Sequence, residues 1–231
     1  TGPGLSVDTY YLREWAGVDR ETGAPQWYTT DANGERVITK SYAKADQISL
    51  DKRATPSVFG GFSTTLTYKN FDFNAVFGYS LGASIYNYSR QEYDSDGAYT
   101  DRNQFSLQKG WKRWAQKGDV ATHPVAAYNN PSNSNKASTR YLESSDFLKL
   151  RSITLGYNFS LKSDIVKALR VYISGENLFC ITNYSGVDPE LPAADAGRNA
   201  SGERSTALSI STGAGVYPSV RKFMLGVNVT F

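Results

Sequence analysis

The last ten residues of the chain decide its fold, and they read Lys222-Phe223-Met224-Leu225-Gly226-Val227-Asn228-Val229-Thr230-Phe231. Every second residue from Phe223 to Phe231 is apolar, and the residues between them are mostly small or polar. Side chains of a β-strand alternate between its two faces, so this pattern predicts a strand with one apolar and one polar face.

The same alternation recurs earlier in the chain, at residues 5–16, 61–68, 71–79, 147–159 and 170–181. The segment 5–16 shows it most weakly. In the segment 147–159, Leu148 and Leu150 are out of phase with Ile153 and the residues that follow it. This change of phase predicts a bulge near Arg151 or a strand that rises beyond its apolar band.

Short and long connections alternate between these strands. The short ones are residues 69–70 and 160–169, and the long ones are residues 17–57, 87–146 and 182–218. Loops longer than about 15 residues are uncommon in compact soluble domains. Long loops at one end and short turns at the other are typical of a membrane barrel. We therefore predict an all-β fold, in which an antiparallel up-and-down meander of about six strands forms a segment of a transmembrane β-barrel.

The composition agrees with two-faced strands. The 231 residues include 16 Tyr, 11 Phe and 4 Trp, yet the mean hydropathy is only -0.45. Alternation of apolar and polar residues lowers the mean hydropathy of a strand without removing its apolar face. A soluble β-sandwich also satisfies this composition, and the long connections are what favour the barrel.

Charge and rare residues exclude several classes of function. The net charge of +3 gives no bias toward nucleic acid. A single cysteine, Cys180, cannot form an intramolecular disulfide, and a single histidine, His123, cannot build a histidine metal cluster. No pattern places a base next to a nucleophile, so we expect no enzymatic activity and no cofactor.

The sequence predicts neither a transmembrane helix nor an N-terminal signal peptide. No run of about 18 apolar residues occurs. The first residues, Thr1-Gly2-Pro3-Gly4, lack the charged and apolar regions of a signal peptide. Six strands are also fewer than the roughly eight that a bacterial barrel needs. We therefore expect this chain to be part of a longer protein.

Ten segments of the chain, in order, closely resemble the C-terminal part of the SusC/RagA family, which are TonB-dependent outer-membrane transporters of Bacteroidetes. They are residues 11–19 (YLREWAGVD), 22–25 (TGAP), 60–63 (GGFS), 79–82 (YSLG), 113–114 (RW), 118–120 (GDV), 138–142 (STRYL), 147–157 (FLKLRSITLGY), 176–179 (ENLF) and 217–223 (YPSVRKF). The resemblance extends over essentially the whole chain.

This resemblance implies a location and a set of partners. Such transporters have a 22-stranded barrel in the outer membrane, an N-terminal plug, and a SusD-like surface lipoprotein that lids the barrel. Residues 1–231 would then supply the last six strands, in contact with lipid, lipopolysaccharide and the rest of the barrel and plug. TonB would act through a missing N-terminal part. The cargo would be a glycan, oligosaccharide or peptide, and no nucleic acid is expected.

The loop aromatics are the candidate contacts for substrate or partner. An amphipathic ring can stack on a sugar or pack against a protein, whereas packing within the loops is the plainer interpretation. The candidates are Trp27, Tyr93, Tyr99, Trp111, Trp114 and Tyr128. An alternative function follows from the same rings: a soluble or surface-attached β-domain that binds carbohydrate through them.

The last strand carries a second candidate site. Its alternating residues look like the signal that the barrel-assembly machinery reads in this class of protein, although a strand that only faces lipid has the same pattern. These residues are Phe223, Leu225, Val227, Val229 and Phe231. Rings near strand ends are interpreted as anchors at the membrane interface, namely Tyr68, Phe71, Tyr86, Tyr157, Phe159, Phe179 and Tyr217.

Three weaker features complete the sequence-based expectations. Asp94, Asp96 and Asp101 around a glycine resemble a calcium loop but lack the ligand at its twelfth position, so no metal site is predicted. Residues 103–114 have the composition of a short helix or 3₁₀ turn. Arg170 and Glu176 fall on the polar face of their strand and are expected to line the barrel lumen.

Overall fold

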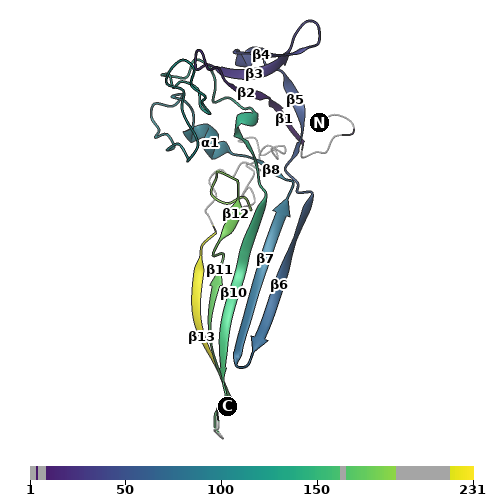
Figure 1. Ribbon diagram of the computed structural model, residues 1–231, viewed down its shortest axis with the longest axis vertical. Coiled ribbons are helices and arrows are strands. Elements are labelled where there is room, and N and C mark those ends of the chain that lie inside the picture. The colour runs from purple at the N-terminus through teal and green to yellow at the C-terminus, as the bar shows by residue number, and fades with distance from the viewer. Residues whose placement is uncertain (1–3, 5–8, 162–164, 191–218) are drawn as a thin grey trace, which may run out of the picture. The chain divides into compact units, whose positions relative to one another are not determined.

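The computed structural model describes residue 4 and residues 9–161, 165–190 and 219–231 (Figure 1). The chain folds into two compact units. The sheet unit comprises Thr55–Ala83, Ser144–Leu191 and Tyr217–Phe231, and the loop unit comprises Thr1–Ala54, Ser84–Glu143 and Pro192–Val216. No helix among the described residues has the length and apolar character needed to cross a membrane.

The sheet unit is an antiparallel meander, as the sequence predicts. Its strands are β6 (Val58–Tyr68), β7 (Phe71–Leu81), β10 (Phe147–Phe159), β11 (Ala168–Glu176) and β13 (Lys222–Thr230). They lie side by side in the order β13-β11-β10-β7-β6 (Figure 1). A short strand, β12 (Cys180–Thr182), also pairs with β10. The predicted strand 170–181 is therefore two strands, separated at Asn177, where φ is +53°.

The register of the sheet unit gives the sheet two different faces. One row across all five long strands is apolar: Leu66, Phe73, Leu155, Ile173 and Leu225. The adjacent row is mostly polar: Thr65, Asn74, Thr154, Ser174 and Met224. Phe73 of this row is partly buried, and the other four side chains are exposed, 61% for Leu66 and 73% for Leu225.

The predicted bulge is confirmed at Arg151. Leu150 pairs with Phe77 and Ser152 pairs with Val76, so Arg151 is an extra residue in β10. The bulge turns the guanidinium onto the polar face, over Gly78. A Cβ on Gly78 would lie 2.8 Å from Nε of Arg151, so a larger residue there would force this side chain to shift.

The first long connection of the loop unit is not an irregular loop. It contains β2 (Trp15–Val18), β3 (Pro25–Thr30) and β4 (Arg36–Thr39) in one three-stranded sheet, then η1 (Tyr42–Lys44) and β5 (Gln47–Arg53). The sixth predicted strand, 5–16, is corrected in part: β1 (Thr9–Arg13) pairs with β5 in a separate two-stranded sheet. Its residues 5–8 lie outside the described residues.

The second long connection begins with a helix that the sequence places elsewhere. α1 (Tyr88–Tyr93) starts after Asn87, whose side chain accepts a hydrogen bond from the backbone N–H of Arg90. The segment 103–114, predicted as a short helix or 3₁₀ turn, forms no helix: it has one local turn, in which the N–H of Trp111 donates to the carbonyl of Gln108, and its other backbone bonds reach distant residues. The N–H of Phe105 donates to the carbonyl of Tyr93.

The end of the second connection returns to the start of the loop unit. η2 (Thr139–Tyr141) leads into β9 (Leu142–Ser144), which pairs with β8 (Ser84–Tyr86). Tyr10, Leu12, Tyr86 and Tyr141 form the apolar core beside these elements, each at most 2% exposed. Leu50 and Ala54 of the first long connection and Ala137 and Leu142 of the second pack against this core, so both connections share one folded unit.

Candidate functional site

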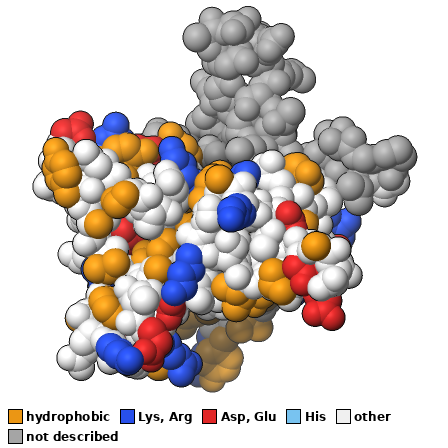
Figure 2. All heavy atoms as spheres, turned by 90° about the horizontal axis from the view of Figure 1, so that it is seen from above, with side chains coloured by type: hydrophobic (Ala, Val, Ile, Leu, Met, Phe, Trp, Pro, Cys, Tyr) orange, Lys and Arg blue, Asp and Glu red, His pale blue; other side chains and the backbone are white. Residues whose placement is uncertain are grey.

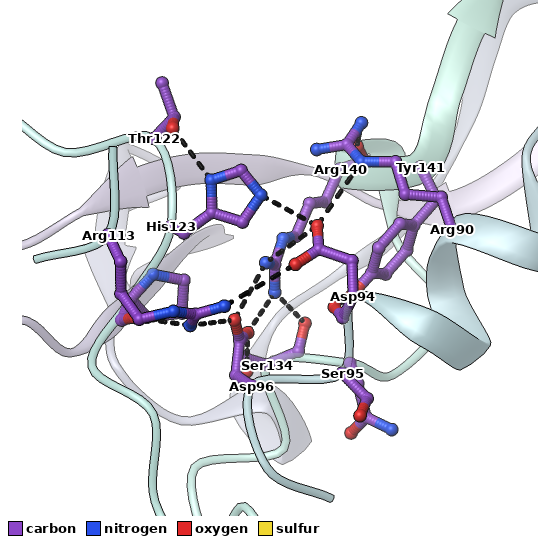
Figure 3. A network of polar contacts seen from close by, with 12 residues as sticks. Arg90, Asp94, Ser95, Asp96, Arg113, Thr122, His123, Ser134, Arg140 and Tyr141 are labelled. Carbon is purple, nitrogen blue, oxygen red and sulfur yellow. Dashed lines mark hydrogen bonds and ion pairs between the residues drawn. The ribbon is translucent and has the colours of Figure 1, made fainter. Parts of the chain in front are cut away.

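A buried ion cluster lies at the centre of the second long connection (Figure 3). Asp94 follows α1 directly as its C-cap, and Asp96 lies two residues further on with φ of +54°. Arg140 of η2 makes a two-pronged contact with Asp96, through Nη1 to Oδ2 and through Nη2 to Oδ1 at 3.2 Å. All three side chains are 3% exposed or less.

Two further arginines and the single histidine complete the cluster. Arg113 Nη1 lies 2.6 Å from Asp96 Oδ1, and Arg90 Nε lies 3.4 Å from Asp94 Oδ2. His123 Nε2 lies 2.8 Å from the same oxygen of Asp94. Arg90 also pairs with Glu143, at 3.1 Å. Three guanidinium groups thus face three carboxylates.

Burial and charge act in opposite directions on these groups. Burial alone would raise the pKa of Asp96, but the charge and hydrogen bonds of Arg140 outweigh it and hold that pKa below its ordinary value. Burial raises the pKa of the neighbouring Tyr141 phenol. Asp96 is thus held in its charged form by Arg140, and pairing of this kind is the condition for charges to be tolerated in a protein interior.

Two of the acidic residues that resemble a calcium loop, Asp94 and Asp96, are paired with arginine side chains. Asp94 and Asp96 face the guanidinium groups of Arg140 and Arg113, which occupy the positions a cation would need. Asp101 lies apart, with a 77% exposed side chain. Within the described residues, no group of three or more His, Cys, Asp or Glu side chains is placed to hold a metal ion.

The structure separates the six candidate loop aromatics into two groups. Trp27 is fully buried in β3 and packs edge-on against Trp15 and Tyr42, with ring centroids 5.6 and 5.5 Å away. Trp111 belongs to the ion cluster, with the Arg90 guanidinium 4.3 Å above its ring and His123 5.0 Å away. These two rings pack within the loop unit.

Trp114 joins the two long connections. Its Nε1–H donates to the carbonyl of Arg20 at 3.0 Å, and its ring covers Gly23 so closely that a Cβ there would overlap it. Gly23 also has a φ of +69°, a conformation that L side chains rarely adopt. The N–H of Val125 donates to the Gly23 carbonyl at 3.0 Å, and this bond adds to the junction.

The remaining three rings reach the surface of the loop unit. Tyr128 is 78% exposed, and Tyr93 is 42% exposed beside Phe105, at a centroid distance of 5.3 Å. Tyr99 lies under the guanidinium of Arg102, 4.6 Å from its ring centroid. Hydrophobic side chains on the face drawn in Figure 2 form separate groups between basic and acidic ones.

The candidate assembly signal lies on the apolar face of β13. Phe223, Leu225, Val227 and Val229 are 43–76% exposed and pair with apolar residues or glycine of β11. Phe231 follows the strand and is 73% exposed.

The predicted interface anchors lie in different places. Four of these rings lie at the short-turn end of the apolar face: Tyr68, Phe71, Tyr157 and Phe159. Tyr86 is a correction, because it is 1% exposed in the core of the loop unit. Phe179 is 42% exposed between β11 and β12. Tyr217 lies outside the described residues.

The polar face of the sheet unit carries ion pairs that the sequence does not reveal. Arg170 Nε donates to Asp72 Oδ1 at 2.9 Å, directly above Gly156. Lys149 is 3% exposed and lies 2.8 Å from Asp188 and 3.0 Å from Glu190. This face is thus charged and internally paired, in contrast to the apolar face opposite.

Sequence comparisons identify relatives over nearly the whole chain, although no family model matches it. TonB-dependent receptor P3 of Formosa agariphila is 29% identical over 239 residues, covering 99% of this chain and 22% of that protein. TonB-dependent receptor SusC of Bacteroides thetaiotaomicron is 26% identical over 233 residues, covering 99% and 20%. The chain therefore spans about a fifth of the length of these curated relatives.

The fold points the same way. A solved RagAB peptide transporter structure aligns with 96% of this chain and 23% of its own, with a TM-score of 0.73 and 26% identity. A RagAB peptide importer in its closed-closed state matches the fold over the full chain with a TM-score of 0.74 and 24% identity. The relatives are named as transporters and receptors and not as enzymes. Sequence and fold together support a fragment of a SusC/RagA-like TonB-dependent transporter.

Proposed function

We propose that this chain forms part of the wall and the external loops of an outer-membrane TonB-dependent nutrient importer. The observation that carries the proposal is the apolar row that crosses every long strand of the sheet unit and is exposed at four of its five residues. Exposed apolar patches of this extent are unusual on soluble proteins. Lipid is the environment in which a two-faced antiparallel sheet of this kind is stable.

The proposal fixes an orientation. Short turns of such barrels face the periplasm and long connections face outward. The β6–β7 turn at Lys69 and Asn70 then faces the periplasm, and the long connections of the loop unit face the outside of the cell. The paired charges on the polar face, such as Arg170 with Asp72, line the lumen.

Orientation is tested by labelling single cysteines in the full-length transporter on intact cells. Position 133, in the second long connection, is expected to react with a membrane-impermeant maleimide, and position 70 is expected to react only after the outer membrane is permeabilised. Cys180 is first replaced by Ser to remove the native thiol. Labelling at position 70 but not at 133 on intact cells would reverse the orientation.

The loop unit is the proposed contact surface for a SusD-like surface lipoprotein and for the cargo, a glycan or a peptide. The solved neighbours are named as RagAB peptide transporters, which supports a two-component importer. The accessible rings Tyr93, Tyr99 and Tyr128 are the side chains available for such contacts. Aromatic rings are enriched at protein interfaces because they bury a large area at low entropic cost.

This contact is tested by replacing Tyr93, Tyr99 and Tyr128 together with Ala in the full-length transporter. We expect weaker co-purification of the lipoprotein and reduced uptake, with unchanged insertion. Tyr11→Ala is the matched control, since Tyr11 is 58% exposed in β1 of the same unit. Wild-type co-purification and uptake by the triple variant would remove these rings from the proposed surface.

A further inference from the structure

One surface segment of the loop unit, residues 124–135 (PVAAYNNPSNSN), carries no charged side chain. Successive turns fold it: the backbone N–H groups of residues 130, 133 and 136 each donate to the carbonyl three residues earlier, at 2.9–3.0 Å. Asn129, Asn130 and Asn133 have φ of +56°, +38° and +57°. Asparagine adopts this left-handed conformation more readily than most residues. The sequence is thus suited to one turn-based conformation of the segment.

The side chain of Asn130 lies at the centre of these turns and is 4% exposed. Its Nδ2 lies 2.9 Å from both the carbonyl oxygen of Ser95 and Oγ of Ser134. Its Oδ1 accepts a hydrogen bond from the hydroxyl of Ser132 at 2.7 Å. One buried amide therefore joins the turns to each other and to the backbone that follows α1.

The ion cluster holds the same segment. The hydroxyl of Ser134 donates to Asp96, and Nη1 of Arg140 donates to the Ser134 carbonyl at 3.2 Å (Figure 3). At the other end, the backbone N–H of Ala127 donates to the Asp96 carbonyl at 3.1 Å. A Cβ on Gly97 would lie 2.3 Å from the carbonyl oxygen of Ala127, so the two backbones are in close contact. The segment is thus fixed on both sides of its turns.

Tyr128 is the ring that this fixed backbone presents to solvent. It is 78% exposed, the highest value among the large hydrophobic side chains that the structure describes as exposed. Val125, in the same segment, is 40% exposed. The other two surface rings have neighbours of their own, because Tyr93 packs against a phenylalanine and Tyr99 lies under an arginine. Tyr128 therefore has the largest area left to bury in a complex.

We propose that Asn130 holds Tyr128 as a preformed anchor for a pocket of the SusD-like lipoprotein, and that Tyr128 contributes more to binding than Tyr93 or Tyr99. The inference rests on the proposed contact with that lipoprotein. Small ligands are bound in concave sites. A ring as exposed as Tyr128 needs a partner that supplies the concave wall, and a folded protein does so.

Two general properties of interfaces support this choice of partner. The centres of protein interfaces are enriched in aromatic residues and depleted of charge, which matches the composition of residues 124–135. Turns that are already ordered raise affinity, because less conformational entropy is lost on binding. A rigid tyrosine among asparagine and serine is also typical of surfaces that recognise proteins.

The test uses the full-length transporter and the lipoprotein that co-purifies with its wild type, purified separately, with both rate constants measured by surface plasmon resonance. Tyr128→Ala is expected to raise the dissociation rate about 30-fold, and Tyr93→Ala about three-fold. Tyr128→Phe keeps the ring and is expected to stay within about two-fold of the wild type. Tyr11→Ala, in β1, is the control and is expected to change nothing.

The positioning role of Asn130 has a separate readout. Asn130→Gly keeps the backbone conformation accessible but removes the side-chain hydrogen bonds. It is expected to lower the association rate about ten-fold, because a smaller fraction of molecules then holds the ring in place. The same substitution in the Tyr128→Ala background is expected to have no effect on association. A merely structural role would slow association equally in both backgrounds.

Several outcomes would overturn the inference. They are wild-type dissociation in Tyr128→Ala, an equal loss in Tyr93→Ala, and equal slowing by Asn130→Gly with and without Tyr128. Normal lipoprotein binding together with lost uptake in Tyr128→Ala would assign the ring to the cargo and overturn the choice of partner. A wild-type transporter that co-purifies with no SusD-like lipoprotein would instead overturn the proposed contact, and this inference with it.

Discussion

The two units of the chain differ in what they expose and in how they bury charge. In the sheet unit the largest apolar residues, such as Phe223 and Leu225, are more than 70% exposed. In the loop unit Asp96, Arg140 and His123 are 6% exposed or less. The described backbone hydrogen bonds of the sheet unit run mainly along strand ladders, and those of the loop unit run through turns and short sheets.

This difference indicates two different surroundings. Exposed apolar area costs about 25 cal/mol per Å² in water, and that cost disappears in hydrocarbon. A buried ion cluster has the opposite requirement, because its charges are stable only while each retains its partner. The sheet unit therefore depends on an apolar solvent, and the loop unit depends on an internal charge balance.

The largest loss of stability in the loop unit is expected from removing Arg140. Arg140→Ala leaves Asp94 and Asp96 buried without their main partner, which costs about 3–5 kcal/mol. Hydrogen exchange of the full-length transporter is expected to show lost protection at residues 84–143 and unchanged protection in β10 and β11. Arg140→Lys keeps the charge without the two-pronged contact and is expected to fall between. Unchanged exchange in Arg140→Ala would show that the cluster does not hold this unit.

The sheet unit is tested by the same substitution on its two faces. Leu225→Arg and Met224→Arg change adjacent large residues of β13, 73% and 46% exposed, that point to the apolar and polar faces. An arginine in hydrocarbon costs about 2–4 kcal/mol near the membrane midplane, whereas one facing a wet lumen costs far less. Urea titration of the protein refolded into lipid vesicles measures both. Equal destabilisation by the two variants would refute the assignment of the faces.

High pH is expected to weaken the loop unit first. Burial raises the pKa of Tyr86 and of Tyr141, and each phenolate would repel the other. A phenol whose folded pKa is raised contributes its full stability below its unfolded pKa, near pH ~10, and loses it as pH rises above that value. The loss is about 1.4 kcal/mol per pH unit for each tyrosine.

Hydrogen exchange of the Tyr10 and Leu12 amides at increasing alkaline pH, corrected for the intrinsic rate, measures this effect. Tyr141→Phe is expected to reduce the slope by about half, since one of two ionisable phenols is gone. Tyr128→Phe removes an exposed phenol and serves as the control. A slope that Tyr141→Phe does not change would mean that another group titrates.

The smallest effect is expected from a surface pair of the same unit. Lys117 lies 2.6 Å from Glu21, with both side chains at least 60% exposed. Such pairs contribute about 0–1 kcal/mol, because water screens them. Lys117→Ala is therefore expected to leave hydrogen exchange at residues 84–143 nearly unchanged. A loss of protection as large as that of Arg140→Ala would show that buried and exposed ion pairs contribute equally to this unit.

The sheet unit was more accessible to sequence analysis than the loop unit. Alternation over 9 to 13 residues identified β7, β10 and β13, and a change of phase located the bulge at Arg151. The short strands β2 to β4 have only 4 to 6 residues, too few for a clear period. One local signal was available there, the Asn33-Gly34 pair that marks the hairpin between β3 and β4.

The ion cluster could not be found from sequence patterns. Asp94 and Arg140 are 46 residues apart, and only tertiary folding brings them together. The sequence identifies Asp94 and Asp96 as neighbouring carboxylates. Their spacing alone does not show whether such a pair binds a metal cation or forms ion pairs with arginine. Likewise, nothing in its sequence neighbours distinguishes the buried ring of Trp27 from the exposed ring of Tyr128.

The backbone N–H of Trp15 donates to the hydroxyl of Thr139 at 2.9 Å across 124 residues of chain. The β6–β7 hairpin, which closes through a two-residue turn, lies between them in sequence. Short-range hairpins form quickly, whereas closing a long segment has a larger entropic cost and is slower. We therefore expect the two ends of the loop unit to meet only after this hairpin exists. A chain that ends before residue 139 would therefore be able to form this hairpin but not the contact that joins the two ends of the loop unit.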